Sequence, residues 1–487
     1  MSTFNFNRFV VFILLVIFSM IIPGVSISEA LDNSKFYTLS PSENSSGLWS
    51  IDPSTGATSL VTPITLPDGS TPNFMTNALA FSPNNELYGW DTARKQLYNI
   101  NYTTGQINYI GSQGTDAAPQ FVNGLAFDKQ GTLYGLVGGN INQGAAPSTL
   151  YSINTSTGAL SPVGNSYVNT SHNSLAVDFE SGGLLSITGG TNSPNYLLQV
   201  NPDAQPVLND TFSSNTSGNY SWSTSGSGTG YSWNSAGYIT MDGYGGAWVP
   251  ASVTARGNID MPSSGYAKID FNISTNGDGQ SRLIFSLLED ADNYFKFVLT
   301  DTTYGSSGYT QRAEKTVNGV SEFTSMAGSL NTGSYSWEMW WNPTNLRMDL
   351  NGTTVQNIAT ADATIIDPVL FDFTVYRFIG NWDSVKVDPG IAEIIDELGI
   401  RYNGIGSEFD PGTGKLYAVR DNNVLYSINI NTGEETEIGI LGNGVSTVNL
   451  AHPWPQTPVV PEPISIVLFI SGGAVLGIRS LRTKNQL

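Results

Sequence analysis

The side chains that most often carry catalysis are scarce in this chain. Its 487 residues include no cysteine and two histidines, His172 and His452. Thiol catalysis and thiolate zinc sites are therefore excluded, and multi-histidine metal sites are nearly so. Both histidines stand near expected strands, where we expect structural or solvent-exposed roles. No phosphate-binding loop, dinucleotide fingerprint or Gly-x-Ser-x-Gly motif occurs in a strand-turn-helix context, so we predict no cofactor and no metal site.

Paired carboxylates are the remaining route to catalysis, because glycosidases place two of them across the bond that they cleave. The densest acidic cluster holds Glu393, Asp396 and Glu397. A jelly-roll glucanase signature would alternate Glu, Asp and Glu on one strand face, whereas position 395 is isoleucine and the cluster lies outside the tryptophan-rich part of the chain. We interpret the cluster as an acidic edge strand, and Asp128 and Asp410 as turn formers. No catalytic residue is predicted.

Exposed aromatic rings are the usual platforms for sugars, because the C–H faces of a sugar stack on them. Alternation along a strand places Trp340 on the face opposite to Trp337 and Trp341. We expect Trp337 and Trp341 in a core and Trp340 partly covered by a loop, with a sugar platform as the alternative. Trp248 follows a glycine-rich run and is a second candidate. The candidate sugar-binding residues are therefore Trp340 and Trp248.

A repeat of four short apolar-alternating runs positions most of the chain. Copies occupy residues 79–111, 125–164 and 406–439, and the turn before the fourth run recurs at 52–56, 101–105, 154–158 and 429–433. Each turn begins with Asp or Asn and ends with Gly, a combination that favours tight turns. One four-stranded meander cannot bury a core alone, so the copies must stack as a propeller or a solenoid.

The two ends of the repeat region favour a closed ring. Residues 448–453 resemble a first strand with nothing after it, whereas residues 36–62 read as strands two to four without a first. If residues 448–453 pair with the N-terminal strands, they complete one blade and close a propeller. An open solenoid would not need a strand from the opposite end of the chain. We predict an all-β fold with a propeller of about five blades, closed by N- and C-terminal strands.

The repeat pattern stops within the fourth copy and resumes at residues 390–399. Residues 206–388 between them hold seven of the ten tryptophans and alternate with the period of strands, without a helical period. This pattern predicts a β-sandwich inserted in the fourth blade. Segments 209–212, 292–297 and 382–387 resemble the laminin-G and concanavalin-like jelly rolls. The resemblance implies a concave face that often binds sugars, sometimes with calcium, although no calcium ligand set transfers to this sequence and calcium stays open.

The first 30 residues have the layout of a secretory signal. One basic residue, Arg8, precedes an apolar run over residues 9–22, and a small-residue end follows at Ala30. The run is shorter than the roughly 20 residues that span a bilayer, which makes a membrane anchor the weaker interpretation. We predict signal cleavage after Ala30 and export of the rest.

Residues 456–487 combine a proline-rich linker, an apolar run over residues 464–478 and a basic tail. The run can enter a bilayer as a helix, and the basic tail favours the cytoplasmic side. This order resembles the PEP-CTERM sorting signal, which implies that an exosortase-type processing enzyme removes the tail. An ordinary stop-transfer anchor is the alternative. The matching residues are Val460, Pro461, Glu462 and Pro463 in the motif, and Arg479, Arg482 and Lys484 in the tail.

The predicted domains follow from these boundaries. They are a signal peptide (1–30), the first part of a propeller (31–205), a jelly-roll sandwich (206–388), the last part of the propeller (389–455), a linker with the Val-Pro-Glu-Pro motif (456–463), and a transmembrane run with its tail (464–487). The C-terminus would anchor the protein to the membrane before processing. We then expect the protein at the cell surface or outside the cell.

Charge narrows the partners. The chain has 20 basic and 40 acidic residues, a formal net charge of −20, which repels nucleic acid and anionic lipid headgroups. We predict a non-catalytic surface or matrix protein, not an enzyme, that binds extracellular polysaccharide or a surface protein, and no nucleic acid. One alternative is a carbohydrate-active enzyme, a glycoside hydrolase or lyase, whose acidic residues converge only in three dimensions. The other is a structural spacer.

Overall fold

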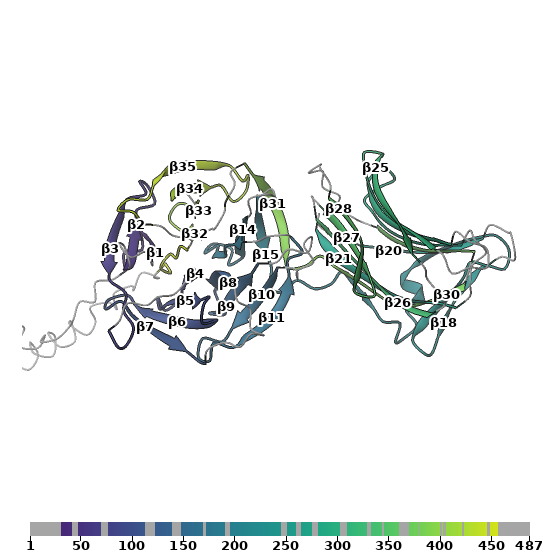
Figure 1. Ribbon diagram of the computed structural model, residues 1–487, viewed down its shortest axis with the longest axis horizontal. Coiled ribbons are helices and arrows are strands. Elements are labelled where there is room, and N and C mark those ends of the chain that lie inside the picture. Colours follow the sequence, from purple (N-terminus) through teal and green to yellow (C-terminus); the bar gives the residue numbers. More distant parts are fainter. Residues whose placement is uncertain are drawn as a thin grey trace, which may run out of the picture. The chain divides into compact units, whose positions relative to one another are not determined.

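The computed structural model describes most of the chain between residues 31 and 455. The described residues are 31–40, 47–69, 76–112, 122–138, 148–168, 172–189, 195–244, 251–259, 264–274, 281–301, 309–328, 333–342, 345–359, 370–377, 379–399, 402, 406–420, 423–445 and 449–455. Figure 1 shows a ring of small sheets and a separate pair of stacked sheets, both built of strands.

Each of the three repeat copies folds into a four-stranded antiparallel sheet. Blade two orders its strands β4-β5-β6-β7, blade three β8 to β11, and blade five β32-β33-β34-β35. The bounds are β4 Thr76–Phe81, β5 Leu87–Asp91, β6 Gln96–Asn101, β7 Gln106–Ile110, β8 Val122–Phe127, β9 Leu133–Val137, β10 Thr149–Ile153, β11 Leu160–Asn165, β32 Gly406–Asp410, β33 Lys415–Val419, β34 Val424–Ile428 and β35 Glu435–Ile440.

The turn before the fourth strand shows why the repeat needs Asx and Gly. In blade two the amide of Thr103 donates to the Asn101 Oδ1 atom at 3.0 Å, and the amide of Gly105 donates to the Asn101 carbonyl at 2.7 Å. Gly105 has φ +73°, and a Cβ at this position would lie 1.8 Å from the carbonyl oxygen of Pro63. Glycine is therefore required both by the backbone conformation and by the close approach of a neighbouring chain segment.

Blade one is completed by the other end of the chain. It contains β1 (Phe36–Ser40), β2 (Gly47–Ile51) and β3 (Thr58–Thr62). The innermost position is filled by Ala451, which exchanges backbone hydrogen bonds of 2.7 and 2.9 Å with Tyr37. The side-chain Oδ1 of Asn449 also accepts from the amide of Leu39 at 3.0 Å. The predicted closure of the ring by both ends of the body is confirmed.

Blade four carries the insertion. Its sheet orders β12-β14-β15-β31, with β13 beside β14. The bounds are β12 His172–Asn173, β13 Ala176–Val177, β14 Leu184–Gly189, β15 Asn195–Val200 and β31 Ala392–Leu398. Strands β15 and β31 are therefore neighbours in space, although the whole sandwich lies between them in the sequence. A five-bladed propeller with a β-sandwich inserted in its fourth blade, as predicted from the repeats, is confirmed.

The inserted domain packs two antiparallel sheets. One orders β18-β19-β30-β21-β26-β27-β28 with β16 beside β30, and the other β17-β20-β29-β22-β23-β24-β25. Besides a short 3₁₀ turn, η2 Ser217–Asn219, the bounds are β16 Leu208–Asp210, β17 Ser221–Ser225, β18 Gly230–Asn234, β19 Tyr238–Asp242, β20 Ser252–Asn258, β21 Gly265–Ile273, β22 Arg282–Leu288, β23 Tyr294–Asp301, β24 Tyr309–Val317, β25 Val320–Gly328, β26 Gly333–Asn342, β27 Asn345–Leu350, β28 Thr353–Ala359, β29 Leu370–Tyr376 and β30 Ile379–Asp388.

The core of the sandwich explains its tryptophan content. Trp337, Trp341 and Trp382 are all buried between the sheets. The indole of Trp337 lies 3.9 Å from the ring of Phe297 and 5.1 Å from that of Phe285, measured between centroids. Alternation along β26 therefore directs Trp337 and Trp341 into the core, as the sequence indicates.

The first strand of blade five, β32, contains the buried acid Glu408. The Glu408 side chain accepts from the amide of Phe409 at 3.0 Å, and burial raises the pKa of its carboxyl to about 8 although backbone N–H groups oppose the shift. Glu408 pairs with Tyr417 on the neighbouring strand. In each of the other four blades, the residue at the corresponding position is alanine. Those alanines are Ala80, Ala126, Ala176 and Ala451. Glu408 is thus a single departure from a small-residue ring.

The predicted terminal segments lie outside the described residues. These are the signal region up to Ala30, the motif at Val460, Pro461, Glu462 and Pro463, and the tail with Arg479, Arg482 and Lys484. Among the residues that the structure does describe, no helix is long and apolar enough to cross a membrane. The predicted terminal helices therefore stay predictions.

Candidate functional site

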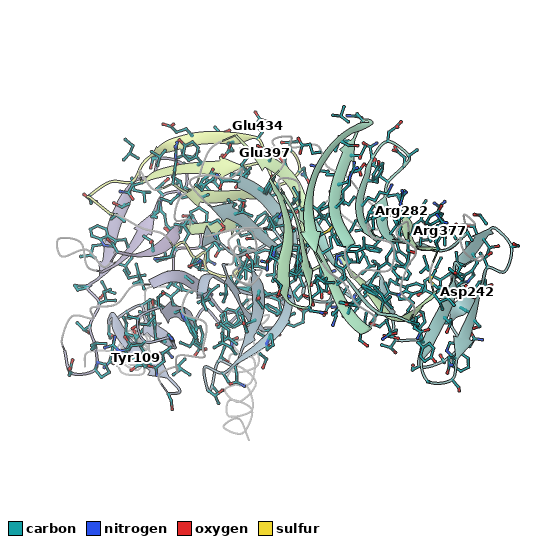
Figure 2. All side chains as sticks on the ribbon, turned by 45° about the vertical axis from the view of Figure 1, so that its right-hand side comes forward. Tyr109, Asp242, Arg282, Arg377, Glu397 and Glu434 are labelled. Carbon is teal, nitrogen blue, oxygen red and sulfur yellow. The ribbon has the colours of Figure 1, made fainter. Side chains whose placement is uncertain are left out.

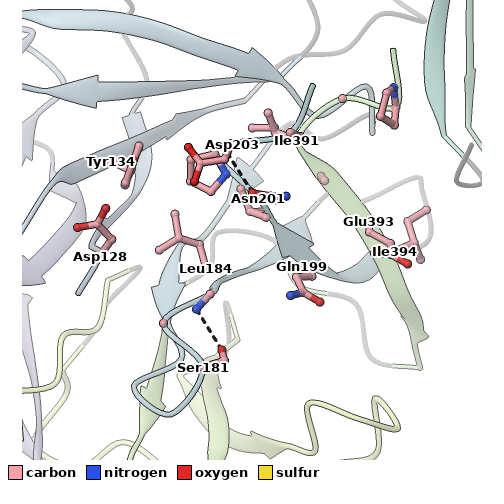
Figure 3. Close-up of a pocket in the computed structure, with 18 of the residues that line it drawn as sticks. Asp128, Tyr134, Ser181, Leu184, Gln199, Asn201, Asp203, Ile391, Glu393 and Ile394 are labelled. Atoms are coloured by element: carbon pink, nitrogen blue, oxygen red, sulfur yellow. Dashed lines mark hydrogen bonds between the residues drawn. The ribbon is translucent and has the colours of Figure 1, made fainter. Parts of the chain in front are cut away.

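A polar pocket lies where the turns of blades three and four meet the two chain segments that lead into and out of the sandwich. Its volume is about 790 Å³, within the range of roughly 300–1,000 Å³ that small-ligand sites occupy. Figure 3 shows Asp128 and Tyr134 on one side, Asn201 and Asp203 in the middle, and Glu393 on the strand beyond them. The polar side chains that line it belong to Asp128, Gln130, Tyr134, Ser181, Gln199, Asn201, Asp203 and Glu393.

Turn chemistry fixes one wall. The Asp128 Oδ1 atom accepts from the amide of Gln130 at 2.9 Å and from that of Thr132 at 2.7 Å. The equivalent turn of blade four uses Asp178, whose Oδ1 accepts from the amide of Glu180 at 2.8 Å. The interpretation of Asp128 as a turn former agrees with these bonds, and the same carboxylate also faces the pocket. Asp128 therefore both stabilises the turn and forms part of the pocket wall.

The connecting segments form the opposite wall. The amide of Asn201 donates to the carbonyl of Ile391 at 2.7 Å, which ties the segment entering the sandwich to the one leaving it. The amide of Asp203 donates to the Asn201 Oδ1 atom at 3.0 Å. These bonds hold the Asp203 segment beside β31, so the insertion itself creates half of the site.

The pocket is electrostatically negative. It contains the carboxylates of Asp128, Asp203 and Glu393, and none of the described residues that line it is Lys, Arg or His. Burial is the main cause that raises the pKa of the Tyr134 phenol, and the charges of Asp128 and Asp203 add to the shift. Such a site offers several hydrogen-bond acceptors to hydroxyl groups and repels anionic ligands.

The acidic cluster of the sequence is divided by the structure. It forms β31, the outermost strand of blade four, in agreement with the interpretation as an edge strand. Both Glu393 and Glu397 are exposed, but Glu393 lines the pocket, whereas Glu397 lies at the far end of the same strand (Figure 2). The Oδ1 atom of Asp396 accepts from the amide of Glu397 at 2.8 Å. Sequence reasoning missed the pocket, although Asp128 and Glu393 were both singled out.

The outward face of the second sandwich sheet does not bring its carboxylates together. One cross-strand row runs Arg256, Asp372, Ser286, Lys296, Glu314. Asp372 and Glu314 are three strand spacings apart, roughly 14 Å at about 4.8 Å per strand, which exceeds the roughly 5–9.5 Å of glycosidase pairs. Asp372 is also held by Arg256 through two bonds of 2.6 Å.

Trp340 lies on the outward face of the first sandwich sheet, as alternation predicts, and is partly buried. The guanidinium carbon of Arg347 lies 5.1 Å from its ring centroid, and the ring of Tyr266 lies at 5.3 Å. Arg347 is in turn held by Asp349 at 2.9 and 2.7 Å. Side chains therefore surround the Trp340 ring, and its role in sugar binding stays a prediction. The other candidate, Trp248, lies outside the described residues.

The two histidines do not lie in the pocket. His452 is buried, and burial lowers the pKa of its imidazole. Its Nδ1 atom lies 2.6 Å from the carbonyl oxygen of Pro453. His172 pairs with Gly189 in the short strand β12. Across the part of the chain that the structure covers, no three His, Asp or Glu side chains form a group that could hold a metal ion.

Comparison with known proteins found similarity only among solved structures. No family model and no curated protein matches the chain. The CBM2 module of Lactobacillus casei BL23 phage J-1 evolved Dit matches with 11% identity, 39% of this chain, 96% of that chain and a TM-score of 0.31. The β-glucanase of Bacillus licheniformis matches with 10% identity, covers 38% of this chain and 98% of its own, and has a TM-score of 0.28. The GH43 protein BlXynB of Bacillus licheniformis matches with 13% identity, covers 64% of this chain and 74% of its own, and has a TM-score of 0.27. At these values the likeness carries no argument about activity.

One sequence-based prediction is corrected by this comparison. We predicted that the chain is not an enzyme because no catalytic motif was found. Glycoside hydrolases are among the matching structures, so the prediction that the chain is not an enzyme does not stand. The similarity itself assigns no activity to this chain. The motif search was too narrow a test, because carboxylates from distant segments can line one pocket, as Asp128, Asp203 and Glu393 do.

Proposed function

We propose that this chain is a carbohydrate-active protein that binds a neutral glycan in the pocket between blades three and four. The observation that carries the proposal is the convergence of Asp128, Asp203 and Glu393 with the Tyr134 phenol, without a cationic side chain among the lining residues. Sugar hydroxyls donate to carboxylates, and a tyrosine ring offers a face for sugar C–H groups. Uronic acids, sulfated sugars and nucleic acids would meet repulsion.

Glycoside hydrolysis at the same pocket is the second candidate. It is favoured because three carboxylates line one cavity, and such enzymes need an acid and a base or nucleophile on opposite sides of the glycosidic bond. Asp128→Asn and Asp203→Asn test this candidate. In Asp128→Asn the amide oxygen can still accept the turn hydrogen bonds from Gln130 and Thr132, as the Asn101 Oδ1 atom accepts a turn bond in blade two. A release of reducing ends by the unaltered protein that both variants abolish supports hydrolysis, whereas no release from any neutral glycan rejects it.

Binding is tested by calorimetric titration with neutral hexasaccharides built from glucose, xylose or mannose, and with oligogalacturonate as the anionic comparison. We expect saturable binding of a neutral chain and none of the anionic one. Glu393→Gln should weaken binding at least about tenfold, since a hydrogen bond to a charged group is worth about 1.5–3 kcal/mol. The matched control is Glu397→Gln on the same strand, outside the pocket. Equal affinities for these two variants would reject the pocket as the binding site.

We also propose that the protein is exported and sorted through its C-terminal signal. The support is the sequence order of the motif, the apolar run and the basic tail, which contains Arg479, Arg482 and Lys484. An exosortase-type enzyme would be the processing partner. Mass spectrometry of the mature protein tests both ends. A mass that starts after Ala30 and lacks the tail agrees with the proposal, and an intact tail rejects it.

A further inference from the structure

Two strands at one end of the sandwich each form the edge of a different sheet. β17 pairs with β20, and β18 pairs with β19, which are the final pairings of the two sheets on that side. Figure 2 shows this end near Asp242, which pairs with Gly230 at the start of β18. The chain passes from one sheet to the other through residues 226–229, so side chains of β17 and β18 can meet across the edge.

The meeting point is a stacked pair of aromatic rings. The indole of Trp222 and the phenol ring of Tyr231 lie 3.7 Å apart between centroids, with 10° between their planes. The Trp222 Nε1 atom donates to the carbonyl of Ser217 at 2.7 Å, which fixes the indole. Tyr231 is 43% exposed, so the ring face that points away from Trp222 is open to solvent. The pair is therefore a rigid aromatic surface with one available face.

The two strands that carry this pair are uncharged and rich in hydroxyl groups, and the charged residues Arg256 and Asp242 lie on the partner strands, opposite Ser221 and Gly230. Residues 211–241 contain no Asp, Glu, Lys or Arg, in a protein whose net charge is −20. Besides Tyr231, the exposed residues of the two strands include Thr224, which alternation places on the same face of β17 as Trp222, and Ser221, Ser223, Ser225 and Ser232, which lie on the opposite faces. A lipid surface or an apolar protein partner would need a contiguous apolar patch, which these serines and threonines interrupt. Hydroxyl groups around an aromatic face instead match a polyhydroxylated, uncharged ligand.

We infer that the Tyr231 surface, formed by Tyr231 on Trp222 with the neighbouring hydroxyl groups, is a second binding site for a neutral glycan. The inference rests on the proposed function, because it assigns the sandwich a ligand of the same chemical class as the pocket. The sugar ring would stack on the free face of Tyr231, and its hydroxyl groups would exchange hydrogen bonds with exposed groups on the same side of the strands, such as the Thr224 hydroxyl. The stacked Trp222 holds the tyrosine ring in place, which reduces the entropy lost on binding.

The experiment uses the full chain and the same neutral hexasaccharides, with tryptophan fluorescence and calorimetry as readouts. Tyr231→Ala removes the ring, Tyr231→Phe keeps it, and Tyr102→Ala changes a tyrosine in a propeller turn as a control. Because an aromatic contact is worth about 0.5–1.5 kcal/mol, Tyr231→Ala should weaken binding about two- to tenfold. Tyr231→Phe and Tyr102→Ala should bind as the unaltered chain does. A thermal scan of each variant establishes that the sandwich is folded.

The outcomes separate the two sites. A loss of affinity for the neutral hexasaccharides in Tyr231→Ala but not in Glu393→Gln supports the Tyr231 surface and rejects the pocket. Loss with Glu393→Gln but not with Tyr231→Ala rejects the Tyr231 surface and leaves the pocket. Loss in both variants, with a larger loss in the double variant, supports both. Equal weakening by Tyr231→Phe and Tyr231→Ala would overturn the stacking argument, and binding of none of the probes would overturn the inference.

Discussion

Replacing Glu408 with glutamine should stabilise the propeller relative to the unaltered protein. This gain in the free energy of unfolding should be larger at alkaline pH than at acidic pH. Glu408 is buried in β32, at a position where the other blades carry alanine, and accepts the amide hydrogen bond of Phe409. A buried carboxyl group resists ionisation. Glutamine keeps the acceptor oxygen and the size of the side chain, so it removes the titration while largely preserving the packing.

The magnitude follows from the two pKa values. Burial raises the Glu408 pKa from 4.5 to about 8, so below pH 4.5 the group is protonated in both states and its contribution to stability is fully present. As the pH rises toward 8 the unfolded chain ionises and the folded one does not, and that stability is lost. At about 1.36 kcal/mol per pH unit, the loss is at most about 5 kcal/mol. Glu408→Gln should escape this loss.

Chemical denaturation near pH 4.5 and above pH 8 measures the difference. The free energy of unfolding of Glu408→Gln, minus that of the unaltered protein, should rise by several kcal/mol between the two conditions. Glu434→Gln changes an exposed acid just before β35 (Figure 2) and should show no such trend. If the difference for Glu408→Gln is the same at both pH values, the carboxyl is not held protonated and the reasoning is refuted.

Three further predictions test the packing. Asn449→Ala removes side-chain bonds to the β1 backbone and should cost about 1–3 kcal/mol of stability; an unchanged urea midpoint would contradict its role in closure. Gly105→Ala should prevent folding or lower the melting temperature far more than Gly131→Ala, because a Cβ meets a carbonyl oxygen at 1.8 Å only at position 105; equal effects would argue against the close approach. Trp337→Ala should cost about 3–5 kcal/mol, and Trp340→Ala, outside the core, about 1 kcal/mol, by calorimetry of the sandwich transition; the reverse order would contradict the assignment of faces.

The architecture could be predicted because its signals are local and repeated. The Asx and Gly positions of the turns, such as Asn101 and Gly105, specify the hairpin in every blade where they occur. The incomplete sets of strands at the two ends then require each other, and Ala451 does fill the place beside Tyr37. The position of the insertion follows from the same repeat, since β31 resumes where β15 stops.

The pocket could not be predicted because no segment contains it. Asp128 belongs to a turn of blade three, Asp203 to the segment that enters the sandwich, and Glu393 to the strand that follows it. In the sequence, Asp128 reads as a turn former and Glu393 as part of an acidic edge, and both descriptions are correct locally. Only the pairing of β15 with β31 brings the entering and leaving segments together.

The aromatic residues show the same limit. Alternation assigns Trp340 and Trp337 to opposite faces of β26, but what covers the outward face depends on neighbouring strands, and Arg347 lies over the Trp340 ring. Trp222 and Tyr231 come from strands of different sheets, so their stacking has no spacing signal. Composition alone gave a hint, through the uncharged run over residues 211–241.

Calorimetric titration of Glu393→Gln and Glu397→Gln with the neutral hexasaccharides tests the central claim most directly. The two variants make the same chemical change on the same strand, and only Glu393 lines the pocket. The pocket account predicts at least about tenfold weaker binding for Glu393→Gln and unaltered binding for Glu397→Gln. Indistinguishable affinities for the two variants, or a preference for the anionic oligogalacturonate, would contradict it.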